Sequence, residues 1–350
     1  MHVPDGFIDA PVSVATGVLA AGAVSVGLRG ARRELDDKAA PLAGLVAAFV
    51  FAVQMLNFPV AAGTSGHLLG GALAAILVGP YTGVLCISVV LLMQSVLFAD
   101  GGLTALGVNI SDMAVVTTVV AYGIFRALVR VLPRRPSGVT IASFVAALVS
   151  VPAAACAFTL IYALGGTTDV PLGKVFTAMA GVHVLIGVGE AVITALTVGA
   201  VVAVRPDLVH GARGLVRPLE LRSPDGTALP APAAPAPAPA RRSTRPVWIA
   251  GLLAALVCAG GVSYYASTSP DGLEKVAHDK GLDSKAEDHA AKDSPLADYQ
   301  VKDVSDARIS GGLAGVIGVG VTLVAGTGVF LVVRRRRTAA PADAPVTGTA

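Results

Sequence analysis

The chain has 350 residues, of which 54% are hydrophobic and only 14% are charged, and its mean hydropathy is +0.73. A soluble domain carries about 25% charged residues, so this composition excludes an ordinary soluble protein and indicates a chain solvated by lipid. The 40 glycines support this view, because glycine lets membrane helices approach closely but destabilises a soluble helical core. The net charge of +3 is small, so its placement is more informative than its sum. No nucleic-acid partner is expected.

The cysteines and the first residues of the chain lead to two further predictions. Cys86, Cys156 and Cys258 all lie inside apolar runs, so they are interpreted as packing residues rather than as disulfide or metal ligands. A cleavable signal peptide begins with basic residues, whereas no Lys or Arg precedes Arg29. Met1 is therefore expected to remain in the mature protein.

Nine apolar runs predict the fold. They fall at about residues 11–28, 40–59, 67–79, 81–98, 111–128, 139–165, 175–204, 247–266 and 309–333. A helix needs about 20 apolar residues to cross a bilayer, and it satisfies its own backbone hydrogen bonds there. The third run is short and ends at Gly79-Pro80, so runs three and four should form a tight helical hairpin. We predict an all-α membrane protein with nine helices.

The basic residues orient these helices. They cluster after runs one, five, seven and nine, at Arg29, Arg32, Arg33, Lys38, Arg126, Arg130, Arg134, Arg135, Arg205, Arg213, Arg217, Arg222, Arg241, Arg242, Arg245 and Arg334 to Arg337. Counting spans, all four clusters fall on one side, which the positive-inside rule makes cytoplasmic, together with the C-terminus. The N-terminus and the segments near residues 60–66, 99–110 and 267–308 are then expected outside a multi-pass cell-membrane protein.

A Pro/Ala-rich stretch at residues 223–240 divides the chain, because such a sequence forms an extended, semi-rigid linker. The predicted parts are a seven-helix module at 1–205, a basic and Pro/Ala-rich cytoplasmic linker at 206–246, a two-helix module at 247–337 with an extracellular segment at 267–308, and a disordered cytoplasmic tail at 338–350.

Among the six histidines, His2 is the most informative. Its large side chain should block removal of Met1, which would keep a free α-amine. That amine, the backbone nitrogen of His2 and the His2 Nδ1 can close two chelate rings on one ion. A further imidazole would complete a planar nitrogen site, which suits Ni(II) or Cu(II) and can also hold Co(II).

His67 is the candidate for the fourth donor. It follows Gly63-Thr64-Ser65-Gly66 and opens the third run on the side predicted for the N-terminus. Thr64 or Ser65 could orient its imidazole. A Met-His start is weak evidence by itself, since any chain can begin that way. An imidazole at the mouth of a spanning helix strengthens it, because ionisable groups at membrane depth usually mark a pathway or a ligand.

Several other polar residues have two readings. His183, about two turns into the seventh run, could line the site or could equally be a packing histidine. Interhelical hydrogen bonds or ordering of the loops around the metal would explain Asn57, Gln94, Asn109, Asp112 and Glu190. His278 and His289 could concentrate metal but are more often simply solvated, and His210 is given no role.

Longer motifs carry a resemblance. The stretch Gln54 to Gly71, QMLNFPVAAGTSGHLLGG, closely resembles the signature of the CbiM/NikM family, the substrate-binding S components of energy-coupling factor (ECF) transporters for cobalt and nickel. Further matches are the start MH-x-P-D-G-F, Gly79-Pro80, FADGG at 98–102, LGVN at 106–109 and HVLIGVGE at 183–190. The resemblance covers roughly residues 1–205. The segment PDGLEKVA at 270–277 resembles the PDGLE domain, which is often fused to these proteins.

This resemblance implies a seven-helix S component whose extracellular N-terminus is tucked into the core. Co²⁺ or Ni²⁺, the transported substrate, would be bound by the Met1 amine, the two His2 nitrogens and His67. Residues expected to surround the site or to order its loops are Asn57, Thr64, Ser65, Asp100, Asn109 and His183. The PDGLE module resembles the small N component, which is thought to assist metal loading. Cobalt, for cobalamin biosynthesis, is slightly favoured over nickel.

The chain lacks the phosphate-binding motif G-x-x-x-x-G-K-[ST], so it is not expected to hydrolyse ATP through that motif or to be an enzyme by itself. The resemblance implies separate ATPase (A) subunits, a membrane coupling (T) subunit and no organic cofactor. The alternative is a stand-alone metal channel or secondary carrier, which would transport metal alone. A metal-dependent membrane enzyme would need an open coordination position, which a planar four-nitrogen site does not obviously offer.

Overall fold

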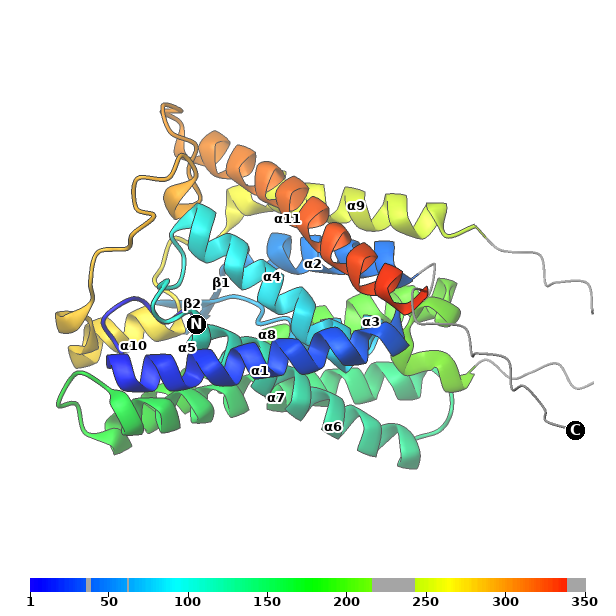
Figure 1. The fold of residues 1–350 in the computed structure, drawn as a ribbon, viewed down its shortest axis with the longest axis horizontal. Coiled ribbons are helices and arrows are strands. Elements are labelled where there is room, and N and C mark those ends of the chain that lie inside the picture. Colours follow the sequence, from blue (N-terminus) through cyan, green and yellow to red (C-terminus); the bar gives the residue numbers. More distant parts are fainter. Residues whose placement is uncertain (36–38, 62, 216–242, 339–350) are drawn as a thin grey trace, which may run out of the picture.

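In the computed structural model of the chain, residues 1–35, 39–61, 63–215 and 243–338 are described (Figure 1). The N-terminal elements are α1 (Ala10–Glu34), α2 (Ala39–Gln54), β1 (Phe58–Ala61), β2 (Thr64–Gly66), α3 (Gly71–Val78), α4 (Pro80–Phe98), α5 (Leu106–Asn109), η1 (Ile110–Val116), α6 (Thr117–Val131), α7 (Pro136–Gly165), α8 (Leu172–Val204), η2 (Pro206–Leu208) and η3 (His210–Leu215). The C-terminal elements are α9 (Arg245–Gly260), η4 (Val262–Tyr265), α10 (Gly272–Lys280), η5 (Leu282–Lys285), η6 (Ala297–Tyr299) and α11 (Ala307–Thr338).

Some expectations fall outside the described residues. These are the Pro/Ala linker at 223–240, the tail beyond 338, and the basic residues Lys38, Arg217, Arg222, Arg241 and Arg242.

Seven helices of the described chain are long and apolar enough to cross a membrane: α1, α4, the continuous helix Leu106–Val131, α7, α8, α9 extended to Tyr265, and α11. Their outer faces expose large aliphatic side chains, such as Val18 on α1 (69% exposed) and Leu164 on α7 (69%). A soluble protein does not leave so many apolar side chains in contact with water. The chain is a multi-pass membrane protein with the predicted helical fold.

The second apolar run differs from the prediction in its last five residues, 55–59. α2 ends at Gln54, and the chain then forms the two-stranded hairpin β1–β2, in which Phe58 pairs with Gly66 and Pro59 with Ser65. The sequence does contain a signal that ends a helix, Pro59, which lies among apolar residues. Proline has no N–H for a helical hydrogen bond and disfavours helical geometry at the preceding residue. α2 is therefore a helix of only 16 residues.

The third run also becomes helical later than predicted. α3 begins at Gly71, and residues 67–70 are held outside regular structure by polar side chains of neighbouring helices. Glu190 on α8 accepts hydrogen bonds from the backbone N–H groups of Leu69 (2.7 Å) and Gly70 (3.1 Å), and Gln54 donates to the Leu69 carbonyl (2.9 Å). As predicted, α3 turns directly into α4. Gly79 makes this turn at φ 103°, which is accessible mainly to glycine.

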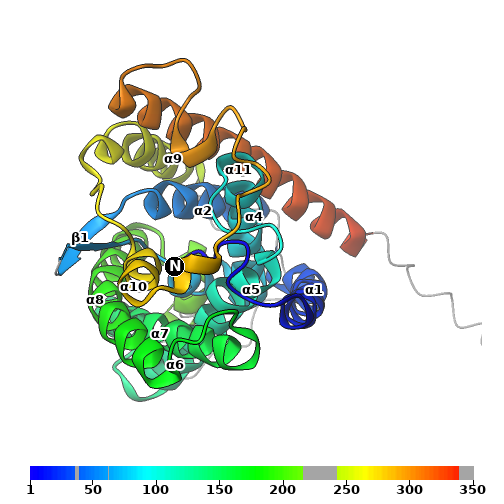
Figure 2. The same cartoon turned by 90° about the vertical axis from the view of Figure 1, so that its left-hand side faces the viewer.

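The helices form one bundle with its long axis along the spans (Figures 1 and 2). α7 packs along α8 and α6, α1 packs along α4, and the short helices α2 and α3 lie inside. The C-terminal helices α9 and α11 pack against α2. The contact is close: a Cβ added at Gly44 of α2 would lie 2.2 Å from the Thr327 hydroxyl of α11. Small residues of this kind allow membrane helices to pack tightly.

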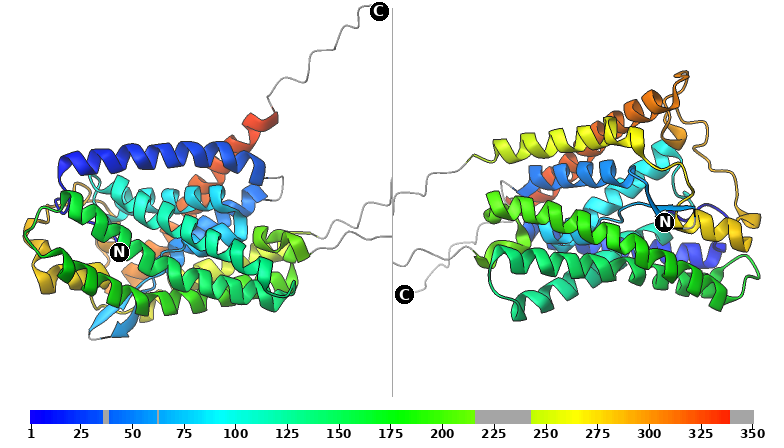
Figure 3. Two further views of the ribbon diagram at one scale, coloured as in Figure 1. Left: turned by 90° about the horizontal axis from the view of Figure 1, so that it is seen from below. Right: turned by 180° about the vertical axis from the view of Figure 1, so that it is seen from behind.

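The two ends of the bundle differ in chemistry. The N-terminus, the β1–β2 hairpin and α10 lie together at one end, as the two further views also show (Figure 3). The ends of α1, α6, α8 and α11 lie at the other, and each is followed by or contains basic residues. This common placement agrees with the clustering predicted from the sequence.

Candidate metal-binding site

The first residues of the chain enter the bundle as an extended segment with a buried backbone. Asn109 holds Val3 by two hydrogen bonds: its Oδ1 accepts from the Val3 N–H (2.8 Å) and its Nδ2 donates to the Val3 carbonyl (3.1 Å). Asp5 accepts from the backbone N–H (2.8 Å) and hydroxyl of Thr104. Met1 is 2% exposed. The α-amine is therefore fixed inside the protein rather than free in solvent.

His67 meets this amine. Its Nε2 lies 2.6 Å from the Met1 nitrogen, and its Nδ1 lies 3.1 Å from the Leu68 carbonyl oxygen. Since a carbonyl can only accept, Nδ1 is the nitrogen that carries the ring proton, which leaves Nε2 with a lone pair directed at the amine. Residues 67–70 lie outside regular structure. A helix beginning at His67 would engage the Leu69 carbonyl, which here accepts a hydrogen bond from Gln54 instead.

His2 lies beside them. Its ring stacks on that of His67, with centroids 5.1 Å apart and planes 20° apart. Burial lowers the pKa of His2 to about 4, against the opposing charge of Asp100, so the ring is neutral near pH 7. Its Nε2 lies 3.1 Å from Gln94 Oε1, and its Nδ1 lies 3.1 Å from Asp100 Oδ1. Both oxygens are acceptors, so a neutral ring with a single N–H can donate to only one of them.

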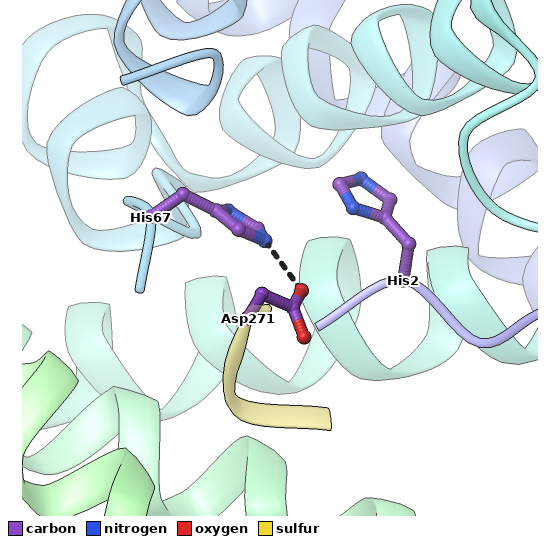
Figure 4. Close-up of side chains that lie close together, drawn as sticks. All are labelled: His2, His67 and Asp271. Carbon is purple, nitrogen blue, oxygen red and sulfur yellow. Dashed lines mark ion pairs between the residues drawn. The ribbon is translucent and has the colours of Figure 1, made fainter. Parts of the chain in front are cut away.

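A fourth group, Asp271, comes from the second part of the chain (Figure 4). We call the described residues up to 215 the N-terminal module and residues 243–338 the C-terminal module. Its Oδ2 lies 2.6 Å from the Met1 nitrogen and 3.4 Å from His67 Nε2. Burial alone would raise the pKa of the Asp271 carboxyl, but the charge of the Met1 ammonium outweighs burial and holds it well below its ordinary value. Potential ligand atoms of His2, His67 and Asp271 all lie within 4.8 Å of one another, so one ion could contact all three side chains.

Backbone contacts between the modules place Asp271. The Ser65 N–H donates to the Pro270 carbonyl (2.9 Å), and the Ser65 hydroxyl donates to the Ser269 carbonyl (2.7 Å). The Ser267 N–H donates to the Asn57 carbonyl (2.7 Å). The β1–β2 hairpin thus serves as the docking edge for residues 267–270, directly before Asp271.

A polar cavity of about 490 Å³ opens beside the site, and its walls come from both modules. His2, His67, Asp100 and Asp271 contribute to its lining. So does Tyr299, whose hydroxyl donates to Asp100 Oδ2 (2.6 Å) and accepts from Gln94 Nε2 (2.9 Å). This cavity is the polar approach to the cluster of nitrogen and oxygen donors.

The structure brings most of the predicted surrounding residues to this region, although not always in the expected role. Asn109 and Asp100 contact the N-terminal segment. Thr64 and Ser65 are buried in β2, where Ser65 bonds the C-terminal module rather than the His67 ring. Asn57 contributes its carbonyl to the docking edge.

His183 is buried on α8 just outside the cluster. Its Nδ1 bonds the Met179 carbonyl (2.8 Å), and its Nε2 has no hydrogen-bond partner among the described residues. A Cβ at Gly272, the first residue of α10, would lie 3.1 Å from its ring. Of the other histidines, His278 is exposed, and His289 Nε2 lies 3.2 Å from the Gly101 carbonyl oxygen.

Sequence reasoning missed the participation of Asp271. The PDGLE segment was recognised, and Asp271 and Glu274 have the spacing of a helix-capping pair, which the structure forms at the start of α10. That signal locates the beginning of a helix. It does not predict that Asp271 contacts Met1, which lies 270 positions earlier in the chain.

Comparisons with known proteins identify the family of the chain. A family model described as the cobalt uptake substrate-specific transmembrane region matches residues 2–208, which is more than half of the chain, and the PDGLE domain model matches residues 245–335. The chain belongs to the cobalt uptake (CbiM) family. It therefore belongs to a family of membrane transporter components for cobalt and nickel and not to an enzyme family.

Three relatives illustrate the range of this family. A Haloquadratum walsbyi protein, provisionally named a metal transport protein, is 40% identical over 60% of this chain and 93% of its own length. The cobalt transport protein CbiM of Sorangium cellulosum is 33% identical over 60% of this chain and 94% of its own. The fused nickel transport protein NikMN of Rhodobacter capsulatus is 41% identical over 36% of both chains.

A solved structure shares the fold. The crystal structure of a transition metal transporter is similar with a TM-score of 0.51 and 29% sequence identity, over 58% of this chain and 93% of that one. The fold of the family and the metal-uptake role of its members therefore apply to the present chain.

Proposed function

We propose that this chain is the substrate-binding S component of an ECF transporter and that it captures Co²⁺ or Ni²⁺ with the Met1 amine, the backbone nitrogen and Nδ1 of His2, and Nε2 of His67. The observation that carries the proposal is the burial of the amine at 2.6 Å from His67 Nε2, with the His2 ring stacked beside them. Burial of an α-amine needs a compensating charge, which the Asp271 carboxylate supplies at 2.6 Å.

The donor set suits the proposed substrates. Neutral imidazoles and an amine are ligands for late first-row ions, and a planar set of four nitrogens favours ions such as Ni(II). The present residues support either ion, and the names of the relatives include both metals. Cobalt and nickel would share these donors.

Energy for uptake would come from partners. The chain carries no G-x-x-x-x-G-K-[ST] motif, so we assign ATP hydrolysis to separate A subunits and coupling to a T subunit in the same membrane. The end of the bundle that holds the N-terminus and α10 would face outside, and the basic helix ends would face the cytoplasm, as the positive-inside rule requires.

Calorimetric titration of the purified full-length chain with NiCl₂ and CoCl₂ tests the capture site. We expect one high-affinity ion per chain, and we expect His67→Ala to weaken binding by at least about 100-fold, since it removes a whole ligand. His278→Ala is the matched control, because its ring is exposed outside the cluster. Equal affinities of His67→Ala and the parent would exclude the proposed ligand set.

Vesicle uptake distinguishes the S component from a stand-alone carrier. Vesicles that contain this chain alone should bind metal without accumulating it, and accumulation should require the T and A subunits with ATP. Sustained accumulation by the chain alone would instead favour a channel or secondary carrier.

A further inference from the structure

We propose that Asp271 supplies an axial oxygen ligand to the captured ion, so that Co²⁺ or Ni²⁺ is bound between the two modules and not by the N-terminal module alone. The inference rests on the proposed function, because it takes the ion to lie among Met1, His2 and His67. It adds a donor of different chemistry, Asp271, which lies in the PDGLE domain and more than 60 residues beyond the end of the family region at residue 208.

The distances between the Met1 nitrogen, His67 Nε2 and Asp271 Oδ2 fit three ligands that occupy adjacent positions around one ion. For metal–ligand bonds of about 2.1 Å, two donors at right angles lie about 3 Å apart. The Met1 nitrogen lies 2.6 Å from His67 Nε2, Asp271 Oδ2 lies 2.6 Å from the Met1 nitrogen, and Asp271 Oδ2 lies 3.4 Å from His67 Nε2. The three atoms therefore form a triangle of about the size expected for three mutually adjacent ligands.

Connectivity then determines the position of Asp271. The Met1–His2 chelate places its backbone nitrogen between the amine and Nδ1, so His67 must lie opposite the backbone nitrogen and next to the amine. All four positions of the plane are then occupied. An atom that is adjacent to both the amine and His67 Nε2 can only lie above or below the plane, which is the axial position of Asp271 Oδ2.

The two oxygens of Asp271 have separate tasks. Oδ1 accepts the backbone N–H groups of Leu273 (2.7 Å) and Glu274 (2.9 Å) at the start of α10. Glu274 completes the capping box by accepting the Asp271 N–H (2.8 Å). Oδ2 is left to face the amine and His67. The carboxylate is thus anchored by one oxygen and directed at the site by the other.

Burial makes this oxygen a strong ligand. Asp271 is 7% exposed, and a carboxylate in such surroundings needs a compensating cation. The Met1 ammonium provides it when no ion is bound. When the amine becomes a ligand, the divalent ion takes over that role at the same position. Docking of the C-terminal module through Ser65 and Pro270 then completes the ligand set.

Nickel K-edge X-ray absorption on the full-length chain loaded with one equivalent of NiCl₂ tests this assignment. A planar four-nitrogen nickel site shows a sharp pre-edge feature that an axial ligand removes. We expect the parent to lack this feature and to show five nitrogen or oxygen ligands rather than four. Asp271→Ser should restore the feature and weaken Ni²⁺ binding about tenfold, since serine caps α10 equally well but does not reach the ion.

Glu274→Gln is the matched control. It removes a carboxylate from the same capping box while glutamine preserves the cap, so its spectrum and affinity should equal those of the parent. If Asp271→Ser does not fold, Asp271→Asn replaces it, with a partial return of the feature and weaker binding expected.

The outcomes separate the two proposals. A planar spectrum in the parent, or identical spectra and affinities in the parent and the Asp271 variant, overturns the axial ligand and leaves the proposed function intact. A parent chain that binds neither Ni²⁺ nor Co²⁺ overturns both.

Discussion

The two modules contribute unlike groups to the same site. The N-terminal module provides nitrogen donors on a rigid frame: Val3 is held by Asn109, and the residues after His67 are held by Glu190. The C-terminal module provides one carboxylate, Asp271, on a short helix that docks through backbone hydrogen bonds. We therefore expect the nitrogen atoms to determine whether an ion binds and the carboxylate to modulate how tightly it is held.

The largest effect should come from removing the His2 ring. His2→Ala deletes Nδ1 and opens one chelate ring, so we expect Ni²⁺ and Co²⁺ affinity to fall by more than about 100-fold in calorimetric titration. His289→Ala removes an imidazole outside the cluster and serves as the control. A His2→Ala affinity within about threefold of that of the parent would contradict the claim that the nitrogen donors of the N-terminal module determine whether an ion binds.

Asn109→Ala should have the second largest effect. It removes two buried hydrogen bonds to Val3 and leaves that backbone unpaired, at a cost of about 1–3 kcal/mol. Because Val3 positions the Met1 and His2 donors, we expect about a tenfold loss of affinity in the same titration. Asn57→Ala, which keeps the backbone carbonyl that docks Ser267, should lose less. An equal loss in both variants would count against a specific role of Asn109.

Undocking the C-terminal module should have a smaller effect than removing a nitrogen donor. Gly44→Leu would force α11 away from α2, because even a Cβ at this position lies 2.2 Å from the Thr327 hydroxyl and 2.9 Å from its backbone nitrogen. We expect a loss of affinity of at most about tenfold, similar to that of Asp271→Ser, with no further loss when both changes are combined. Gly328→Leu on α11 is the control, since nothing lies within 4 Å of its Cβ position. Additive losses would show that module docking and Asp271 act separately.

The smallest effect is expected at His183. Glutamine can replace its hydrogen bond to the Met179 carbonyl, and the ring lies outside the cluster of His2, His67 and Asp271. We expect His183→Gln to change affinity by less than about threefold in the same titration. A loss as large as that of His67→Ala would move His183 into the ligand set.

Sequence patterns predicted the helices well and the site unevenly. Apolar runs located the spans because a lipid-facing helix must be apolar over its whole length. The same uniformity concealed the end of α2 at Gln54 and the β1–β2 hairpin, where Pro59 was the only sharp signal. Motif resemblance singled out Met1, His2 and His67, and the structure brings these three residues together. Asp271 could not be paired with them, since that contact depends on how two modules dock.

The roles of neutral polar residues were equally hard to predict. Thr64 and Ser65 were both candidates to orient His67. Ser65 bonds Pro270, a contact that depends on the position of a segment about 200 residues away. Gln94 and Glu190 were assigned either to helix contacts or to ordering of the site loops. The structure shows Gln94 at the His2 ring and Glu190 on the loop after His67.

The central claim is that the α-amine of Met1 is a metal ligand, and one protein sample can test it. The full-length chain is produced with an N-terminal extension that a protease removes to leave Met1 as the first residue. Titration with Ni²⁺ before and after cleavage then compares a displaced and a free amine in the same preparation. We predict no high-affinity binding before cleavage and one ion per chain afterwards. Equal affinity in both states would contradict the account.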